Sequence, residues 1–199
     1  MGSEMCIRDS LRRVTRKVTP PFNSYLRVSD KMSLSRHPRD VLKIGICWAG
    51  SPRHVHDPYR NRSCPPNLFK VLAELNGIEL YGLPVEPPAH SEHLTFDLTD
   101  LSHKILNFYN TAEAILALDL IVSVDTAVIH LTGALGKPGI VALSYAADWR
   151  WGDGNGCTPW YSSIQMIRQS VPGDWEEVFQ RISAHVKTTY LNSGPITSR

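Results

Sequence analysis

The sequence predicts an α/β protein with a Rossmann-like, doubly wound parallel sheet. Short apolar runs alternate along the chain with segments whose apolar residues recur at helical spacing, which is typical of βαβ units. One run, LIVSV at residues 120–124, is so uniformly apolar and β-branched that both of its faces must be covered, as in a parallel sheet. Gly77, Gly136 and Pro138 follow helical segments and indicate where these end.

We expect five strands, all parallel in one sheet, at residues 44–48, 78–83, 120–124, 140–143 and 163–167. Helices should connect the first four strands and follow the last one, at residues 66–75, 111–119, 126–136 and 174 to about 190. Pro66 suits a first helical turn, and Thr111 lies near a helix cap. FDLTDL at residues 96–101 suggests one more short element.

Composition limits the classes of protein that remain. A chain of 199 residues, of which 42% are hydrophobic, can bury a real core, which we place in one domain at residues 41–191. Ten Lys or Arg against four Asp or Glu up to Lys43 give +6, so the remainder carries −4 of the net +2, and no broad basic surface for nucleic acid is expected. No apolar run is long enough for a transmembrane segment. The four cysteines form neither a CxxC pair nor a Cys/His cluster, which argues against zinc and a disulfide framework and favours a cytoplasmic location.

The ends of the chain are expected to lie outside this domain. Residues 1–40 read as a poorly ordered lead-in and linker, and residues 192–199 as a tail. MCIRDS at residues 5–10 back-translates to a sequence like the adapter of transposase-based sequencing libraries, so we interpret residues 1–10 as an artefact and the chain as the tail of a longer protein. The alternative is a basic targeting presequence in RDSLRRVTRK.

A carboxylate and a hydroxyl stand where the strand at 120–124 gives way to a helix. Ligands of open α/β sheets bind beyond the carboxyl ends of strands, where the next helix offers unpaired N–H groups and a partial positive charge. A phosphate there could bind the N–H groups of Thr126 and Ala127 and the Thr126 hydroxyl, with His130 one turn further on. Asp125 would cap the helix or orient a ligand hydroxyl. The alternative is an ordinary N-cap at Asp125 and a core histidine at His130.

Several motifs in order resemble a known family. LDLIVSVDTAVIHLTGALGKP, YAADWRWG, PWY and IRQ followed by GDW are similar to the C-terminal half of bacterial glycosyltransferase family 9 and related tetratricopeptide-repeat glycosyltransferases, a group that contains the ADP-heptose lipopolysaccharide heptosyltransferases. WAGSPRHVHDPYRNRS is similar to the first strand and loop of that half. The resemblance implies a GT-B fold of two Rossmann-like domains, of which this chain has only the C-terminal, nucleotide-sugar-binding one.

The resemblance also implies a set of donor-binding residues. The site would be lined by the strand-to-helix junction, by the first loop, where Pro52 and His54 also match, and by the loop around DWRW: Asp125, Thr126, Ala127, His130, Ser51, Arg60, Arg62, Asp148 and Arg150. The arginines would neutralise leaving-group phosphate. Alternatively, Arg60 and Arg62 belong to a solvated loop, and Trp149 packs the DWRW loop instead of covering the base or sugar.

The expected reaction is inverting transfer of a sugar from a nucleoside-diphosphate sugar without a metal or cofactor. In the family the catalytic base belongs to the N-terminal domain, so none is assigned in this chain. The chain reads DTA where heptosyltransferases usually read DTG, which places heptose in doubt. It also reads Asn110-Thr111-Ala112 where nearer relatives usually have an Asp. The alternative function is a non-catalytic Rossmann-like nucleotide-binding or interaction module. A dinucleotide oxidoreductase is disfavoured because no GxGxxG follows a predicted strand.

Overall fold

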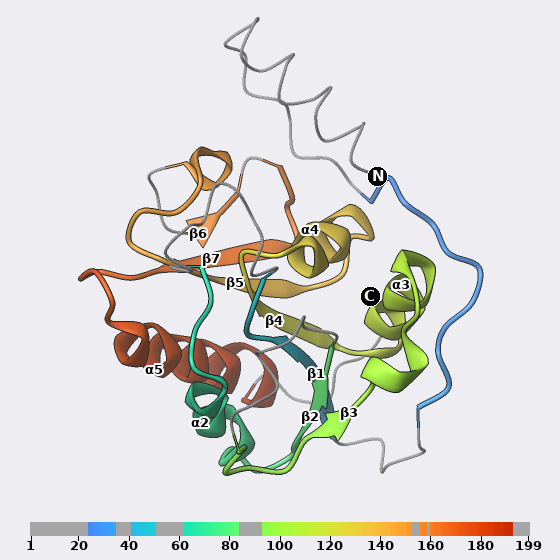
Figure 1. Ribbon diagram of the computed structural model, residues 1–199, viewed down its shortest axis with the longest axis horizontal. Helices are drawn as coiled ribbons and strands as arrows, with labels where there is room; N and C mark the ends of the chain where they lie inside the picture. Colours follow the sequence, from blue (N-terminus) through green and yellow to red (C-terminus); the bar gives the residue numbers. More distant parts are fainter. Residues whose placement is uncertain are drawn as a thin grey trace, which may run out of the picture.

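A computed structural model of the chain describes residues 24–34, 41–50, 62–83, 93–152, 156–158 and 160–192. In these residues seven strands form a single sheet in the order β3-β2-β1-β4-β5-β7-β6 (Figure 1). The strands are β1 (Leu42–Cys47), β2 (Ile78–Gly82), β3 (Thr99–Asp100), β4 (Leu120–Val124), β5 (Gly139–Leu143), β6 (Gly156–Cys157) and β7 (Ile164–Arg168).

The α/β class and the parallel sheet are confirmed. All five predicted strands are present and pair in parallel, for example Ser123 of β4 with Val141 of β5. Every residue of β4 and β5 is buried, as the apolar LIVSV run predicts for a strand covered on both faces. The short element expected within residues 96–101 is β3, which pairs with the end of β2. Only β6, which the sequence did not indicate, is antiparallel to its neighbour among the described strands.

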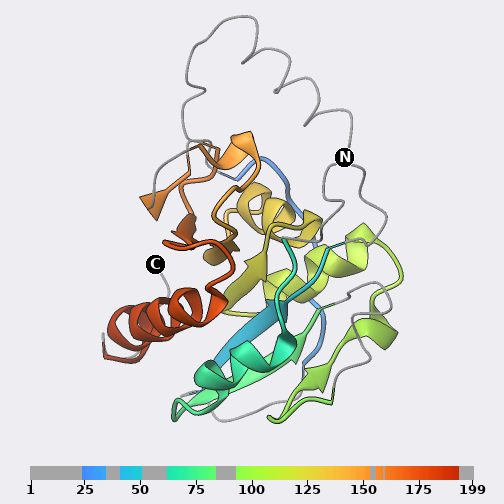
Figure 2. The ribbon, with the colours of Figure 1, turned by 60° about the vertical axis from the view of Figure 1, so that its left-hand side comes forward.

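The helices lie in two layers, one on each face of the sheet (Figures 1 and 2). α3 (Phe108–Ala117) and α4 (Ala127–Ala134) cover one face, whereas α2 (Lys70–Ala73) and α5 (Trp175–Val186) cover the other. α5 buries the residues Val178, Phe179, Ile182 and Val186, which helical periodicity places on one face. The Phe179 ring meets that of Phe69 edge to face, with ring centroids 4.6 Å apart.

The first helix differs from the expected one in its type and α3 differs in its start, whereas the last helix ends close to residue 190, as expected. The first helix begins as a 3-10 turn, η1 (Pro66–Phe69), before α2. α3 starts at Phe108 instead of residue 111, because the Asn107 side chain accepts a hydrogen bond from the Asn110 N–H at 2.9 Å and so caps the helix. The last helix continues beyond α5 as a π-helical turn, η4 (Lys187–Leu191).

Part of the lead-in contacts the domain, contrary to the poor packing expected of residues 1–40. The N–H groups of Tyr25 and Leu26 both donate to the Ala134 carbonyl at the end of α4, and the Met32 N–H donates to the Glu113 carbonyl in α3. Apolar side chains of this segment are half-buried against the core. In Figure 1 residues 24–34 run along the outer side of α3 and α4. The N-terminal 23 residues, including MCIRDS, and the tail at 193–199 lie outside the described residues.

The strand order shows one point at which the winding direction of the sheet reverses. The chain leaves β1 toward β2 on one side, and β4 returns to the other side of β1, so the winding direction reverses between β1 and β4. In open α/β sheets ligands bind outside the carboxyl ends of the strands at such a reversal. Within the described residues no helix is both long and apolar enough to span a lipid bilayer.

Candidate functional site

The junction between β4 and α4 lies at this reversal of the sheet. β4 ends at Val124, and Thr126 is the N-cap of α4 in an extended conformation, with φ −138° and ψ 169°. Asp125 therefore precedes the cap and does not occupy it, which corrects one role considered for it. The Thr126 side chain makes no capping hydrogen bond; its hydroxyl lies 2.9 Å from Ser123 Oγ and 3.8 Å from Cys47 Sγ at the end of β1. The first-turn N–H groups of α4 are thus not capped by Thr126, and Ala127 is exposed.

Asp125 and His130 lie side by side at the junction. Asp125 Oδ1 lies 3.6 Å from His130 Nε2, and the two side chains are only 9% and 13% exposed. Burial raises the pKa of the Asp125 carboxyl, but the opposing effects of His130, and then of the Trp151 indole and the Arg62 charge, outweigh burial and lower this pKa below its ordinary value. The site therefore holds a buried carboxylate that stays ionised at neutral pH.

Two aromatic side chains from distant parts of the chain hold His130. Its Nδ1 lies 3.2 Å from the Tyr161 hydroxyl. The Trp151 ring, which is 1% exposed, stacks on the imidazole with centroids 5.0 Å apart and planes inclined by 21°. The Tyr161 ring reaches His130 because Gly133 in α4 has no side chain: a Cβ there would lie 2.3 Å from Tyr161 Cγ.

The loop after β1 adds a positive charge to the junction. The Gly50 N–H donates to Ser63 Oγ at 3.3 Å, which ties the end of β1 to the start of the next described segment. A Cβ at Gly50 would lie 3.6 Å from Arg62 Nη2 and 3.8 Å from both the Asp125 carbonyl oxygen and the Thr126 methyl group. Arg62 thus lies beside the start of α4. Four other residues assigned to this loop, Ser51, Pro52, His54 and Arg60, lie outside the described residues.

Asp148 and Arg150 contact each other. Arg150 lies in the turn η3 (Trp149–Trp151) and Asp148 is its N-cap: Asp148 Oδ1 accepts from the Arg150 N–H at 3.0 Å and lies 2.8 Å from Arg150 Nη1. The Arg150 guanidinium lies over the Trp149 ring, 5.3 Å from its centroid. Trp149 is 41% exposed whereas Trp151 is 1% exposed, so Trp151 is the more deeply packed of the two.

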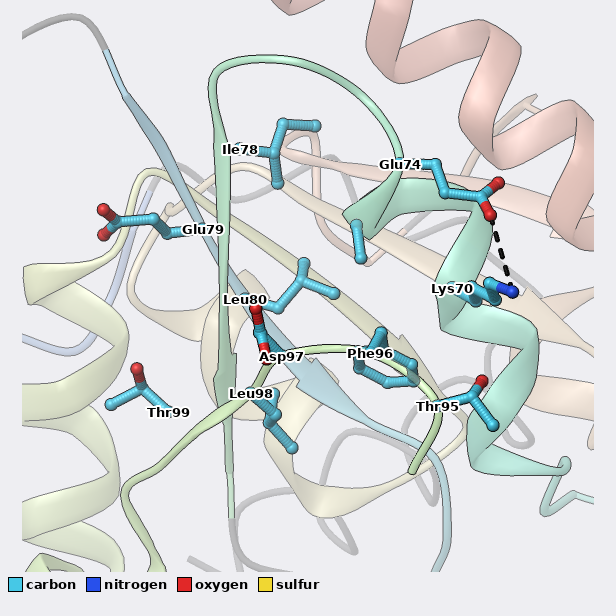
Figure 3. A pocket seen from close by; sticks show the side chains of 11 residues that line it. Lys70, Glu74, Ile78, Glu79, Leu80, Thr95, Phe96, Asp97, Leu98 and Thr99 are labelled. Atoms are coloured by element: carbon cyan, nitrogen blue, oxygen red, sulfur yellow. Dashed lines mark ion pairs between the residues drawn. The ribbon is translucent and has the colours of Figure 1, made fainter. Parts of the chain in front are cut away.

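A separate hollow of about 570 Å³ lies between α2, β2 and residues 95–99 (Figure 3). Leu80 and Phe96 contribute apolar side chains to its wall, and the exposed pair Lys70 and Glu74, with N and O atoms 3.7 Å apart, stands at one side. None of the residues expected in the donor site lines this hollow, and the carboxylate in its wall is that of Asp97. It therefore competes with the junction as a place for a ligand.

The junction offers anion-binding groups and a carboxylate side by side. Backbone N–H groups at the start of α4 and the Arg62 guanidinium suit a phosphate, whereas Asp125 can accept a hydrogen bond from a ligand hydroxyl. Among the described residues no group of three or more His, Cys, Asp or Glu side chains could hold a metal ion. Sequence reasoning assigned no role to Tyr161 and considered Trp151 only as one of the DWRW aromatics that would cover the base or sugar, although both stand in motifs that carried the family resemblance.

The fold and the position of the junction define a class: a Rossmann-like α/β domain with a polar cluster at the switch point of its sheet.

No protein-family model matches the sequence, and no curated protein matches it either. Solved structures do match. E. coli heptosyltransferase WaaC with ADP superposes with a TM-score of 0.53 and 18% identity over 76% of this chain and 45% of that chain. E. coli ADP-heptose lps heptosyltransferase II gives 0.50 and 14% identity, over 75% of this chain and 46% of that chain. The chain thus shares a heptosyltransferase-like fold and spans less than half the length of these two proteins.

Proposed function

We propose that the chain is the donor-binding domain of a GT-B glycosyltransferase related to family 9, which transfers a sugar with inversion from a nucleoside-diphosphate sugar. The observation that carries the proposal is the start of α4, which Thr126 leaves uncapped at the switch point of a heptosyltransferase-like fold, with Asp125, His130 and Arg62 around it. One of the two structural neighbours is described with ADP, a product of such a transfer.

The diphosphate would bind the N–H groups at the start of α4. The helix dipole and the fixed charge of Arg62 would stabilise the negative charge that develops on the leaving group, so the reaction needs no metal ion. Asp125 would accept a hydrogen bond from a hydroxyl of the sugar or ribose. The proposal names a class of donor and not one sugar, since the sequence reads DTA at residues 125–127.

Activation of the acceptor would come from a second Rossmann-like domain. The chain covers 45% and 46% of its two structural neighbours, and transfer requires a base beside the acceptor hydroxyl in addition to a bound leaving group. The proposed enzyme acts in the cytoplasm, where nucleotide sugars are available. The resemblance to tetratricopeptide-repeat glycosyltransferases adds such repeats to the proposed second domain. A non-catalytic nucleotide-binding module would bind the same ligand without transfer by the full-length protein.

Titration calorimetry with ADP, UDP and GDP tests the site. We expect at least one of them to bind with a Kd between about 10 μM and 1 mM, because a few charge-assisted hydrogen bonds act while half of the cleft is absent. Ala127→Pro removes one N–H donor at a first-turn position where proline is tolerated, since Thr126 is already extended. This variant should bind about 10-fold more weakly.

Two controls make the comparison specific. Phe108→Pro introduces proline at the corresponding first position of α3 and should leave the affinity unchanged. Arg62→Ala should weaken binding, and Arg62→Lys should restore part of it because the charge is kept. Absence of heat with all three nucleotides, or equal affinities for wild type and Ala127→Pro, would refute the site. Transfer activity by this chain alone would refute the assignment of the base to a second domain.

A further inference from the structure

A carboxylate beside a phosphate site needs an explanation. Asp125 immediately precedes Thr126, and the lowered pKa of its carboxyl keeps it ionised at neutral pH. A like charge within a few ångströms of a bound phosphate would weaken binding, most strongly in a partly buried site where water screens poorly. The surroundings of Asp125 must therefore offset its charge if the start of α4 is to hold an anion.

We propose that Tyr161 and Trp151 are positioning residues that hold the Nε2–H of His130 toward Asp125, and that this arrangement offsets the Asp125 charge and lets the anion bind at the start of α4. The second part of this inference rests on the proposed function, whereas the first part concerns the free protein. Tyr161 acts through its contact with His130, and Trp151 acts through its stacking on His130 and through its own indole nitrogen beside Asp125.

The groups on either side of His130 favour one position for the proton of its neutral ring. Nε2 faces Asp125 Oδ1 at 3.6 Å, a distance longer than a hydrogen bond but short enough for strong electrostatic attraction, so a proton on Nε2 is favoured. In the neutral imidazole Nδ1 is then an acceptor, and the Tyr161 hydroxyl at 3.2 Å donates to it. Tyr161 thus selects the tautomer that points a donor at Asp125.

Trp151 fixes the plane of the same ring and faces Asp125 itself. Its ring stacks on the imidazole at 5.0 Å, which restricts rotation of His130 about its side-chain bonds. The indole nitrogen is buried and makes no hydrogen bond of ordinary geometry within the described part of the chain, yet it lies near enough to contribute to the lowered pKa of Asp125. An indole N–H in this position adds a second partial positive charge beside the carboxylate.

Nitrogen-detected NMR of His130 tests the positioning in the absence of any ligand. Wild-type protein should show a single neutral tautomer with the proton on Nε2. Tyr161→Phe removes the donor to Nδ1 while it keeps the ring, and should give a mixture of tautomers or ring orientations. Tyr81→Phe is the matched control, since it also removes the hydroxyl of a buried tyrosine, one that donates to Glu79 at 2.9 Å in β2, and it should leave the His130 signals unchanged. An identical single Nε2–H tautomer in Tyr161→Phe would overturn the positioning role.

A double-mutant cycle on nucleotide affinity tests the consequence. Tyr161→Phe and Trp151→Phe should each weaken ADP binding by about 3- to 10-fold in calorimetry. In an Asp125→Asn background the charge to be offset is gone, so Tyr161→Phe should then cost less than about 2-fold. Equal losses with and without the Asp125 carboxylate would overturn the claim that His130 acts by offsetting this charge. If the wild-type chain binds none of ADP, UDP and GDP, the proposed function and this consequence fail together, and the NMR result alone decides the positioning role.

Discussion

Asp125 is the residue whose environment determines the behaviour of the junction. Burial would raise its pKa, but His130, Trp151 and Arg62 together lower that pKa below the ordinary value of 3.8. A carboxyl whose pKa is lower in the folded than in the unfolded state stabilises the fold above the unfolded value, and this contribution is lost as the pH falls through the folded value. The free energy of unfolding of the wild type should therefore fall in acid partly through Asp125.

Urea unfolding at pH values between about 2 and 6 measures this effect. Asp125→Asn should be less stable than wild type at the upper end of this range, and the difference should shrink toward the lower end, where the wild-type carboxyl is protonated as well. A difference in unfolding free energy that stays constant across the range would show that the charge of Asp125 is not what stabilises the junction.

Gly133 in α4 leaves the space that the Tyr161 ring occupies beside His130. A Cβ at this position would lie 2.3 Å from Tyr161 Cγ and 2.5 Å from Cδ1, closer than real side chains approach. Gly133→Ala should cost about 1 to 3 kcal/mol of unfolding free energy, despite the higher helix propensity of alanine, because the ring must move. Denaturant unfolding measures it, and Gly50→Ala, where the nearest atom would be 3.6 Å away, should cost far less. Equal costs would mean that Tyr161 repacks freely.

For single residues, the sequence predicts contacts between near neighbours in the chain better than contacts between distant residues. Asp125, Thr126 and His130 lie within six residues, and helical geometry alone brings them to one place. Tyr161 is 31 residues from His130, and nothing in the spacing shows which aromatic residue reaches it. Trp149 and Trp151 are equivalent by type, and only the path of η3 decides that Trp151 is buried and Trp149 is exposed.

Among the elements, α3 shows how a capping residue sets a boundary. The Asn107 side chain accepts from the Asn110 N–H at 2.9 Å, which satisfies an otherwise unpaired donor of the first turn. Asn107→Ala should lower the unfolding free energy by about 1 kcal/mol, whereas Asn107→Asp keeps the acceptor and should stay near wild type. Urea titrations of the three proteins measure this. A loss of similar size in both variants would contradict the capping role.

Two residues of capping type explain why the sequence predicts a start of the same helix at residue 111. Thr111 and Asn107 are both capping types, and the apolar periodicity becomes clear only after Thr111. In the structure Thr111 instead lies inside α3, where its hydroxyl donates to the Asn107 carbonyl at 3.1 Å. Gly136 was easier to interpret: its φ of +70° ends α4 in the left-handed conformation that glycine favours, and the Lys137 N–H donates back to the Thr132 carbonyl at 3.1 Å.

For the whole molecule, the segment at residues 24–34 links the lead-in to the helical layer of α3 and α4. The N–H groups of Tyr25, Leu26 and Met32 are held by carbonyls of these helices. Hydrogen exchange should therefore show protection at these three amides well above that of an unfolded chain. Gly136→Ala, whose Cβ would lie 2.8 Å from Ser24 Cβ, should reduce protection at Tyr25 and Leu26 more than at Met32. Unprotected amides in the wild type would show that the segment does not dock.

The docking of this segment could not be predicted from the sequence, whereas the sheet could. Local apolar runs identify the five strands, and the helices between them indicate βαβ units, whose strands are parallel. Residues 24–34 have no periodicity of their own, and their hydrogen bonds reach helices roughly 80 to 110 positions further along the chain. The reversal between β1 and β4, which locates the junction, likewise follows from the order of strands in space and not from any single motif.

The central claim is that a nucleoside diphosphate binds at the start of α4, and amide NMR during titration with ADP tests it most directly. We expect the largest shift changes at the amides of Ala127 and Val128, the first residues of α4, and we expect Ala127→Pro to reduce the changes at Val128 at a given ADP concentration. The hollow between α2, β2 and residues 95–99 is the alternative place for a ligand (Figure 3). Shift changes centred on Thr95, Phe96 and Leu98, with Ala127 and Val128 unmoved, would contradict the account.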